Sequence, residues 1–285
     1  MSIQPIIDHC GLRVNSYETV TGGDINRAYC LYTGDAKYFL KVNDARLYPL
    51  MFEKEAAALE AFHNRSTIVV PSVINCATIN GNQYLLLEWL ERGPVRKDSW
   101  QKFGEYLALL HQQPQPFFGW DHDNFIGSLV QRNQQFPAWD LFYSECRIMP
   151  LVKELFNQHI FSITDVESAE LFCKKLGQLF PLEPAAMLHG DLWSGNYLIT
   201  VSGDAAFFDP AVYCGHREMD IGMTNLFGGF NPQFYDSYQE TYPLENGWRQ
   251  RLPLTQLYPL LVHAVLFGGH YINSARGIIR HFSGG

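Results

Sequence analysis

The chain has 285 residues, 47% of them hydrophobic and 18% charged, and a formal net charge of −8. This composition is typical of a globular protein with a large core and excludes a disordered chain. The acidic balance argues against nucleic acid or an anionic membrane as a main partner. No apolar stretch has the length of a transmembrane helix and no secretory leader is evident, so we expect a cytoplasmic protein.

The six cysteines are scattered, with no C-x-x-C pair and no zinc-binding spacing, so we expect reduced, packed thiols. The histidines of the second half do not stand at helical ligand spacing with an acidic partner. A histidine-bound metal centre is therefore not expected. The sequence leaves the oligomeric state open, and a monomer is assumed.

Alternating and apolar patterns divide the first 88 residues into short elements. In chain order we expect a short helix within 3–15, a hairpin of 28–33 and 37–42, a helix over 51–62 and a buried strand over 84–88. A glycine-bearing turn that contains Gly22 and Gly23 precedes the hairpin. Such a loop lets backbone N–H groups approach phosphates closely, although two glycines are equally typical of a plain turn.

A polar stretch with glycine and proline follows Glu88 and predicts a linker between two lobes. From Ser99, a candidate cap, the apolar period changes from two to about 3.6, which predicts helices. We expect them over 99–111, 139–155 and 166–179, with loops and further helices from 227 to 270. The sequence therefore predicts an α+β protein with an N-terminal antiparallel sheet lobe, residues 1–88, and a larger, mostly helical lobe, residues 89–285.

The residues that indicate chemistry gather in one stretch, Leu188–Asn196. His189, Asp191 and Asn196 fit the order H-x-D-L-x-x-x-N, the spacing of a kinase catalytic loop. Asp209 ends a short apolar run downstream, as the metal-holding aspartate of a kinase ends a strand. Phosphoryl transfer needs a carboxylate that faces the acceptor hydroxyl, here Asp191, and oxygen ligands for Mg²⁺, here Asn196 and Asp209. A plain turn before a strand is the alternative interpretation.

This loop gives a role to residues upstream of it. Lys41 lies on the second strand of the predicted hairpin, and the next helix carries Glu55, with Glu53 as the alternative. In kinases such a lysine contacts the α- and β-phosphates of ATP and is held by a glutamate of the following helix. From topology alone, the backbone C=O of Glu88 and the N–H of Leu90 would face adenine.

Charged residues also interrupt the apolar segment 215–223, where burial would require a partner or a function. We expect Asp220 to brace the backbone of the catalytic loop and His189 to shape its turn. Arg217 is expected to pair with Glu218 or with a substrate group.

The chain resembles the fructosamine kinase (ketosamine-3-kinase) family, within the aminoglycoside-phosphotransferase and choline-kinase-like branch of the kinase fold. The resemblance covers most of the length, and its most specific part is Trp193-Ser194-Gly195, because the other branches share only the outer His, Asp and Asn. The further matching motifs are Gly22-Gly23-x-Ile25-Asn26, Phe39-Leu40-Lys41-Val42-Asn43, Met51-Phe52-Glu53-x-Glu55, Phe118-Gly119-Trp120, Asp123-Asn124-x-Ile126-Gly127, Gln131-x-Asn133, Asp209-Pro210-Ala211-x-Tyr213, Gly215-His216-Arg217-Glu218 and Leu266-Phe267-Gly268-Gly269.

The resemblance implies a bilobal protein-kinase-like fold and phosphorylation of the sugar 3-hydroxyl of a ketosamine, free or on a protein lysine, with ATP and Mg²⁺. The 3-phosphate makes the adduct unstable, so that the sugar leaves and the amine is restored. Carried over to this sequence, Asp191 is the base or hydroxyl orienter, and Trp193, Trp120 and Asn124 are expected to contact the sugar. Asp24 replaces a cysteine of some relatives, which argues against redox control through the glycine loop.

Two other functions stay open. A kinase for an aminoglycoside or an amino alcohol would need converging carboxylates or an aromatic cage, and Asp121 and Asp123 are candidates for the carboxylates. An inactive kinase-like scaffold that binds nucleotide or a partner is the other alternative. The complete set of lysine, aspartates and asparagine in the expected catalytic positions argues against such a scaffold.

Overall fold

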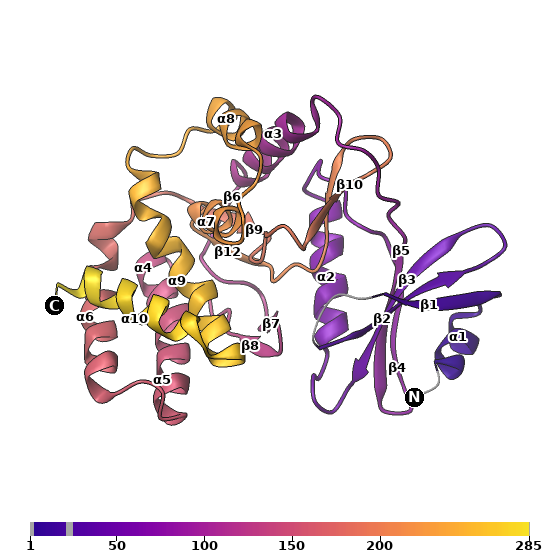
Figure 1. The fold of residues 1–285 in the computed structure, drawn as a ribbon, viewed down its shortest axis with the longest axis horizontal. Helices are drawn as coiled ribbons and strands as arrows, with labels where there is room; N and C mark the ends of the chain where they lie inside the picture. Colours follow the sequence, from indigo (N-terminus) through magenta and orange to yellow (C-terminus); the bar gives the residue numbers. More distant parts are fainter. Residues whose placement is uncertain (1–2, 21–24, 285) are drawn as a thin grey trace. The chain divides into compact units, whose positions relative to one another are not determined.

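The computed structural model describes residues 3–20 and 25–284. The chain divides into two compact units, which can be followed in Figure 1: Met1–Ser99 with Tyr197–Pro210, and Trp100–Asn196 with Ala211–Gly285. The first unit therefore includes the stretch 89–99 and a later hairpin, whereas the sequence predicts the boundary after Glu88. The contacts of that hairpin explain the difference.

A five-stranded antiparallel sheet, in the order β1-β2-β3-β5-β4, forms the centre of the first unit (Figure 1). Its strands are β1 (Ser16–Val20), β2 (Arg27–Tyr32), β3 (Lys37–Asp44), β4 (Val73–Ile79) and β5 (Asn82–Glu88). The predicted hairpin and buried strand are confirmed. The helix α1 (Gln4–Cys10) packs its isoleucines against Leu40 and Leu86 on one face. Because side chains alternate along a strand, Lys41 points to the other face, which α2 (Met51–His63) covers.

The hairpin of β10 (Tyr197–Ile199) and β11 (Ala205–Phe207) belongs to the first unit through backbone pairing. Val69 exchanges hydrogen bonds with β11, and the N–H of Gly93 donates to Ile199 O at 2.8 Å. A Cβ at Gly93 would collide with the carbonyl of Thr200, so only glycine allows this approach. The ring of Phe207 packs edge-on against Phe62 of α2, with centroids 4.9 Å apart. The end of β11 is thereby placed beside α2.

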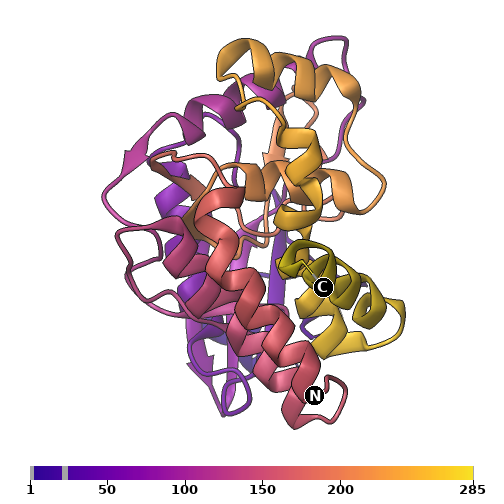
Figure 2. The same ribbon diagram turned by 90° about the vertical axis from the view of Figure 1, so that its left-hand side faces the viewer.

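The second unit is mostly helical. Its helices are α3 (Ser99–His111), α4 (Trp139–Phe142), the π-helix η1 (Tyr143–Ile148), α5 (Met149–Asn157), α6 (Ile163–Leu179), α7 (Glu218–Leu226), α8 (Pro232–Thr241), α9 (Trp248–Phe267) and α10 (His270–Ser283). The predicted helices over 99–111, 139–155 and 166–179 are confirmed, and α6 begins earlier because Ser162 and Asp165 form a capping box. Helices α6 and α10 lie side by side (Figure 2).

Ser99 does not cap α3 as expected. It is the first helical residue, and its hydroxyl accepts from the N–H of Arg96 and donates to Gly203 O. Within the first unit, the side chain therefore ties the end of the stretch 89–99 to the β10–β11 hairpin. None of the helices in residues 3–20 and 25–284 has the length and apolar character that a bilayer span requires.

The second unit also contains short strands, one of which leads directly into the catalytic loop. They are β6 (Pro114–Gln115), β7 (Asn124–Ile126), β8 (Leu129–Gln131), β9 (Ala185–Leu188) and β12 (Tyr213–Gly215). The strand β9 is central in the order β12-β9-β6, and all four of its residues are buried. His189 follows at once, so the loop emerges from the buried centre of the unit.

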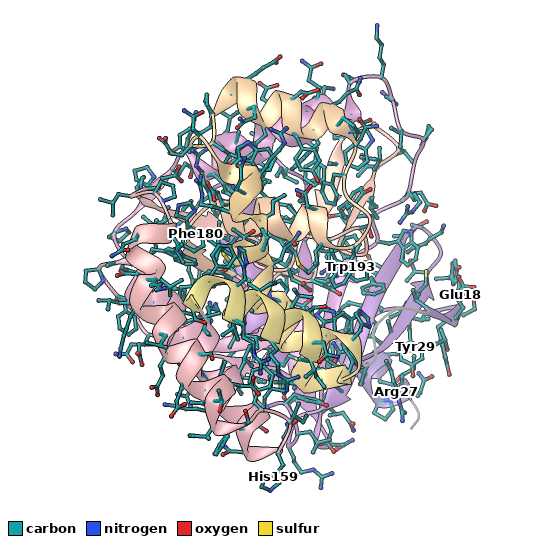
Figure 3. All side chains as sticks on the ribbon, turned by 60° about the vertical axis from the view of Figure 1, so that its left-hand side comes forward. Glu18, Arg27, Tyr29, His159, Phe180 and Trp193 are labelled. Atoms are coloured by element: carbon teal, nitrogen blue, oxygen red, sulfur yellow. The ribbon has the colours of Figure 1, made fainter. Side chains whose placement is uncertain are left out.

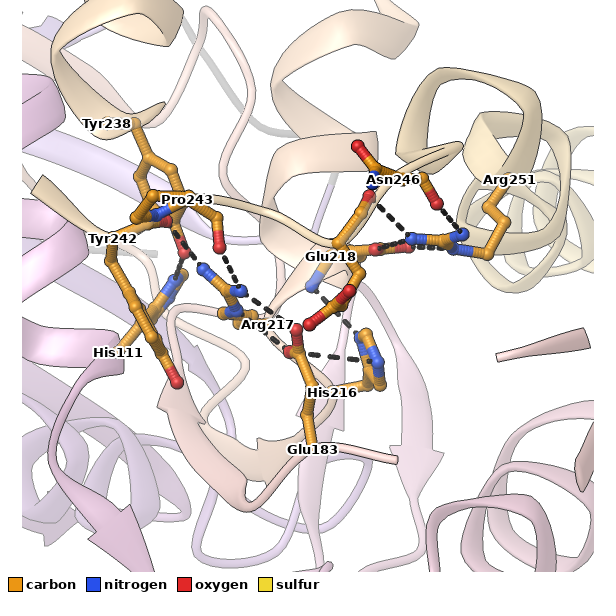
Figure 4. Close-up of polar contacts among 11 residues, drawn as sticks. His111, Glu183, His216, Arg217, Glu218, Tyr238, Tyr242, Pro243, Asn246 and Arg251 are labelled. Carbon is orange, nitrogen blue, oxygen red and sulfur yellow. Dashed lines mark hydrogen bonds and ion pairs between the residues drawn. The ribbon is translucent and has the colours of Figure 1, made fainter. Parts of the chain in front are cut away.

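A buried ion pair fixes the chain just before α7 (Figure 4). Arg217 donates to both carboxylate oxygens of Glu183 at 2.8 Å, and to the carbonyls of Tyr242 and Pro243 at 2.7 Å. The Tyr242 ring lies 3.6 Å from the guanidinium carbon. Burial raises the pKa of Glu183, but the bond from Arg217 outweighs it and holds the pKa below its ordinary value.

The expected pairing of Arg217 with Glu218 is wrong. Glu218 accepts from Nε of Arg251 on α9 at 2.8 Å instead (Figure 4). Consecutive residues at a helix start project about 100° apart, so the two side chains reach different neighbours.

Replacing Arg217 by Met should lower the free energy of unfolding by about 3–5 kcal/mol at pH 7, because Glu183 is left as an unpaired buried carboxylate. Adding Glu183→Leu should restore most of the loss. The single variant's deficit should shrink as the pH falls from 7, because the unpaired Glu183, whose pKa burial raises, takes up a proton in the variant, and below about pH 4 the wild type also loses the stabilising charge of Glu183. Urea denaturation followed by circular dichroism measures these values. A deficit under about 1 kcal/mol at pH 7 would contradict the argument.

Candidate functional site

The backbone of the catalytic loop is held by Asp220 of α7. The N–H groups of His189 and Gly190 donate to its two carboxylate oxygens at 2.8 and 2.9 Å. The N–H of Asp191 donates to Nδ1 of His189 at 3.2 Å. The predictions that Asp220 braces the loop and that His189 shapes the turn are therefore confirmed.

Asp220 remains ionised in this buried position. Burial raises its pKa, but His111, whose Nε2 lies 3.3 Å away, and the donating N–H groups outweigh that effect, and the pKa is lowered. Gly190 next to it has φ +82°, and a Cβ there would collide with the carbonyl of Ala211. The glycine of the His-Gly-Asp sequence is thus needed for both backbone shape and space.

Asp191 and Asn196 lie together in the second unit. The Nδ2 of Asn196 donates to Oδ2 of Asp191 at 2.9 Å and to its backbone carbonyl at 2.9 Å. The amide nitrogen is thereby committed to Asp191, which leaves the amide oxygen of Asn196 as a ligand for a hard cation. The asparagine side chain both orients the carboxylate and offers a metal ligand.

In the first unit, one lysine is shared by two carboxylates. Lys41 Nζ lies 2.8 and 2.9 Å from the carboxylate oxygens of Glu55 and 2.7 Å from Oδ1 of Asp209. Burial lowers the pKa of Lys41, but the two carboxylates outweigh it and the pKa is raised. Burial also raises the pKa of Glu55, to about 7. Glu53, the alternative partner in the sequence, is exposed.

Asp209 has the geometry expected of a ligand that must reach out from a strand end. It follows β11 with φ +55°, a left-handed conformation that is strained for most residues but accessible to aspartate. Its side chain is 42% exposed, so a carboxylate oxygen can face a bound ion. A carboxylate oxygen suits Mg²⁺, which takes other ligands from phosphates and water. Asp209 belongs to the first unit and Asn196 to the second.

The Trp-Ser-Gly sequence inside the loop also has a steric explanation. A Cβ at Gly195 would collide with the ring of Trp193, which therefore folds back over the glycine. Trp193, labelled in Figure 3, meets Phe227 edge-on with centroids 6.0 Å apart. The Phe227 ring packs against the His263 ring, and His263 against Tyr271, with centroids 5.0 and 4.9 Å apart.

The sequence analysis missed this aromatic continuation of Trp193. Phe227, His263 and Tyr271 come from three different segments, and only tertiary packing brings them together. Burial lowers the pKa of His263, so its ring is held in the neutral form. The three residues and Trp193 form what we call the aromatic wall.

Two residues that were expected to contact the sugar, Asn124 and Arg217, are buried and bound by other protein groups. Asn124 is 4% exposed, and its Nδ2 donates to Val212 O while its Oδ1 accepts from Gln131 and Asn133. Arg217 is 3% exposed and is engaged by Glu183. A sugar could reach either side chain only by breaking these buried contacts. Sugar contact by these two residues stays a prediction, and two of their partners, Val212 and Glu183, lie 88 and 34 residues away in sequence.

For the remaining candidate site residues the structure gives less direct evidence of a role. Trp120 is partly buried against the core of the second unit. Glu88 ends β5, where its N–H donates to Ser72 O and its carboxylate accepts from the Ser72 hydroxyl, and Leu90 lies just beyond. The adenine contacts predicted for Glu88 and Leu90 stay a prediction. Gly22 and Gly23 lie outside the described residues.

Comparison with known proteins gives this arrangement a family. The model of the family described as fructosamine kinase matches residues 4–283. A protein of Vibrio parahaemolyticus named "Probable ketoamine kinase" is 40% identical over 259 residues, which cover 90% of this chain and 88% of that protein. The chloroplastic protein-ribulosamine 3-kinase of rice is 34% identical over 273 residues, which cover 94% of this chain and 78% of the rice protein.

Solved structures agree with this match. The crystal structure of a candidate fructosamine-3-kinase from Thermobifida fusca matches with a TM-score of 0.87 and 32% identity, covering 98% of this chain and 97% of that chain. A spectinomycin phosphotransferase matches with a TM-score of 0.61 at 15% identity, covering 100% and 94%, which shows the fold alone. The expected α+β, protein-kinase-like fold is confirmed. With a family model that spans nearly all its residues and relatives well above 30% identity, the chain belongs to the fructosamine kinase family.

Proposed function

We propose that this protein transfers the γ-phosphoryl group of ATP to the 3-hydroxyl of a ketosamine, carried by a free amine or by a protein lysine. The product adduct then breaks down and the amine is restored. The observation that carries the proposal is the oriented Asp191 carboxylate, which Asn196 holds in a loop braced by Asp220. The names of the relatives, a ketoamine kinase and a protein-ribulosamine 3-kinase, support this substrate class.

The residues on the nucleotide side fit the same reaction. Lys41, held by Glu55 and Asp209, supplies a fixed positive charge for the α- and β-phosphates. Asn196 and Asp209 would hold Mg²⁺. When bound, the ion neutralises negative charge on the phosphates during transfer. Structural neighbours solved with ADP or with AMP-PNP support a nucleotide as the donor.

On the acceptor side, Asp191 receives the proton of the sugar hydroxyl or orients that hydroxyl towards the phosphate. Its Oδ2 accepts from Asn196, which holds the carboxylate in one orientation. The aromatic wall around Trp193 offers apolar surface to the C–H face of a sugar. Trp193 stands two residues after Asp191, so the contact surface and the acceptor of the proton come from one loop.

The aminoglycoside alternative finds less support. The Oδ1 of Asp123 accepts from the backbone N–H of Asn133 at 2.7 Å, and that of Asp121 from Gln135 at 3.3 Å. The carboxylates of the loop are therefore used within the loop itself. A polycationic substrate needs carboxylates that converge on it.

Asp191→Asn should lower kcat for a ketosamine by about 10²–10⁴-fold, because the amide cannot take the hydroxyl proton. The KM for ATP should stay within about threefold of the wild type, since Asp191 does not contact the nucleotide in this proposal. ADP release and ³¹P NMR, run on ribulosamine, fructosamine, an aminoglycoside and an amino alcohol, give these constants.

Asp236→Asn, on the exposed side of α8 in the same unit, serves as the matched control and should leave kcat unchanged. If the wild type phosphorylates the aminoglycoside but no ketosamine, the proposed substrate class is wrong. Binding of ATP without transfer to any acceptor would support the inactive scaffold.

Trp193→Ala should raise the KM for the ketosamine by about 10–200-fold, which is the range for the loss of 1–3 kcal/mol of apolar contact. The KM of Trp193→Phe should lie between those of the wild type and Trp193→Ala, because phenylalanine keeps an aromatic face. The KM for ATP is expected to change little. Phe156→Ala, an exposed ring on α5, is the control for general loss of an aromatic residue. Equal KM values for wild type and Trp193→Ala would remove Trp193 from the sugar site.

A further inference from the structure

A buried arginine of the second unit has no carboxylate partner. Arg147 is 0% exposed, and no carboxylate in residues 3–20 and 25–284 forms an ion pair with it. Its guanidinium donates to the carbonyls of Arg132 and Cys146 and, at 2.8 Å, to Oδ1 of Asn133. Its buried Nε has no hydrogen-bond partner among the described residues. A charge in such a place is unfavourable unless the surrounding structure depends on it.

The surroundings stabilise the cation with neutral groups. The guanidinium carbon lies 4.5, 4.0 and 5.1 Å from the ring centroids of Phe142, Tyr213 and Tyr258. Ring faces carry negative potential and attract a desolvated cation. Arg147 itself lies in the π-helix η1, and such short π-helical turns are rare and frequent at functional sites. The side chain is therefore held in one orientation from several sides.

From Arg147 a chain of buried amides begins. Asn133, whose Oδ1 accepts from the guanidinium, donates from Nδ2 to Oδ1 of Asn124 at 2.9 Å. Asn124 in turn donates from Nδ2 to the carbonyl of Val212 at 2.8 Å. The two amides are 1% and 4% exposed, so water does not compete for these bonds.

Gln131 forms a second branch of the same network. Its Nε2 donates to Oδ1 of Asn124 at 2.8 Å and to the carbonyl of Ala211 at 3.0 Å. Its Oε1 accepts from the hydroxyl of Tyr258 at 2.8 Å. Tyr258 is one of the rings around Arg147, so the branch returns to the guanidinium. We call Asn124, Gln131 and Asn133 the amide layer.

Groups that can only donate or only accept fix the direction of every bond in the amide layer: the guanidinium of Arg147 at one end, and the carbonyls of His122, Ala211 and Val212 at the others. A carboxamide can present either its oxygen or its nitrogen, whereas a guanidinium can only donate. Asn133 must therefore turn its oxygen to Arg147, which aims its nitrogen at Asn124. The oxygen of Asn124 is then occupied, and its nitrogen faces Val212.

The carbonyls at the end of the amide layer belong to backbone that supports the catalytic centre. Ala211 donates its N–H to the carbonyl of His189 at 2.9 Å, and its own carbonyl packs against Gly190. In sequence, Ala211 stands two residues after Asp209. This backbone thus contacts the loop of Asp191 and directly continues the segment that carries Asp209.

We infer that Arg147 is a positioning residue, whose donor-only guanidinium fixes the amide of Asn133 at one end of the amide layer and so helps to hold Ala211 and Val212 against the catalytic loop. The inference rests on the proposed function only in that Asp191 and Asp209 act in phosphoryl transfer. It assigns a role to Asn124 that differs from sugar contact. It also explains a buried charge that ion pairing does not explain.

Asn133→Asp separates this role from a purely stabilising one, because it gives Arg147 the carboxylate it lacks but removes the donor to Asn124. If Arg147 only stabilises the fold, the new ion pair should leave kcat within twofold of the wild type. If it acts through the amide of Asn133, kcat should fall at least tenfold, with the KM for ATP within threefold. Steady-state ADP release with a ketosamine measures both constants, and thermal unfolding measures Tm.

Two further variants keep the test decisive. Gln131→Glu, close in shape, removes the donor to Ala211 and should lower kcat at least tenfold even if Asn133→Asp does not fold. Arg147→Lys keeps the charge but loses the planar fork, and its kcat should lie between those of the wild type and Arg147→Met. Wild-type kcat in Gln131→Glu or in Arg147→Met would overturn the inference.

Arg276→Met is the matched control in the same unit. Arg276 also donates to a carbonyl, that of Ile160, and lies 5.1 Å from the Phe161 ring, but it pairs with the carboxylate of Asp165. This variant should lower Tm and leave kcat unchanged. If the wild type phosphorylates no ketosamine, the proposed function fails by itself. The same variants are then compared by slow ATP hydrolysis to water, where an unchanged rate would still overturn the inference.

Discussion

The geometry of the catalytic loop depends on one buried carboxylate. Asp220 accepts the N–H groups of His189 and Gly190, which would otherwise end β9 as buried donors without partners. Each such donor left unpaired costs about 1–3 kcal/mol. With His111 beside it, the carboxylate stays charged, and charged acceptors form the stronger hydrogen bonds. The backbone direction of the loop at Asp191 is therefore fixed by Asp220 of α7 together with the loop's own Gly190 and His189.

The two units balance buried charge in opposite ways. Around Lys41 there are two carboxylates for one cation, and Asp209, the more exposed of the two, is the one that we propose as a metal ligand. Around Arg147 there is no carboxylate in the described residues, and carbonyls, an amide oxygen and ring faces take its place. An excess carboxylate favours binding of a cation, whereas a cation among neutral dipoles orders those dipoles. The first arrangement prepares a ligand site and the second a rigid support.

Local patterns in the sequence predicted the parts of the structure that local contacts determine. The loop spacing placed Asp191 and Asn196 together because only five residues separate them, and the Ala- and Glu-rich pattern located α2 and with it Glu55. The β10–β11 hairpin was not assigned to the first unit, because its pairing with Val69 bridges more than 130 residues. Register of that kind leaves no periodic signal in either segment.

The buried polar residues of the candidate site show the same limit of prediction from sequence. Nothing near Asn124 in the sequence distinguishes an asparagine that meets a sugar from one that holds the carbonyl of Val212, 88 residues away. Arg217 was ambiguous for the same reason, since Glu183 lies 34 residues upstream. A polar residue in a matching motif indicates that the position matters, but its contacts decide whether it binds a ligand or supports the residues that do.

The catalytic loop thus separates general chemistry from specificity within nine residues. His189, Asp191 and Asn196 form a hydrogen-bonded unit that any hydroxyl acceptor could use. Trp193 stands between them in sequence and turns its ring onto Gly195, which has no side chain to obstruct it. A larger residue at Gly195 would displace the ring and, through the backbone of the next residue, Asn196 as well. A change at Gly195 would therefore act both on Trp193, the proposed sugar contact, and on its neighbour Asn196, the proposed metal ligand.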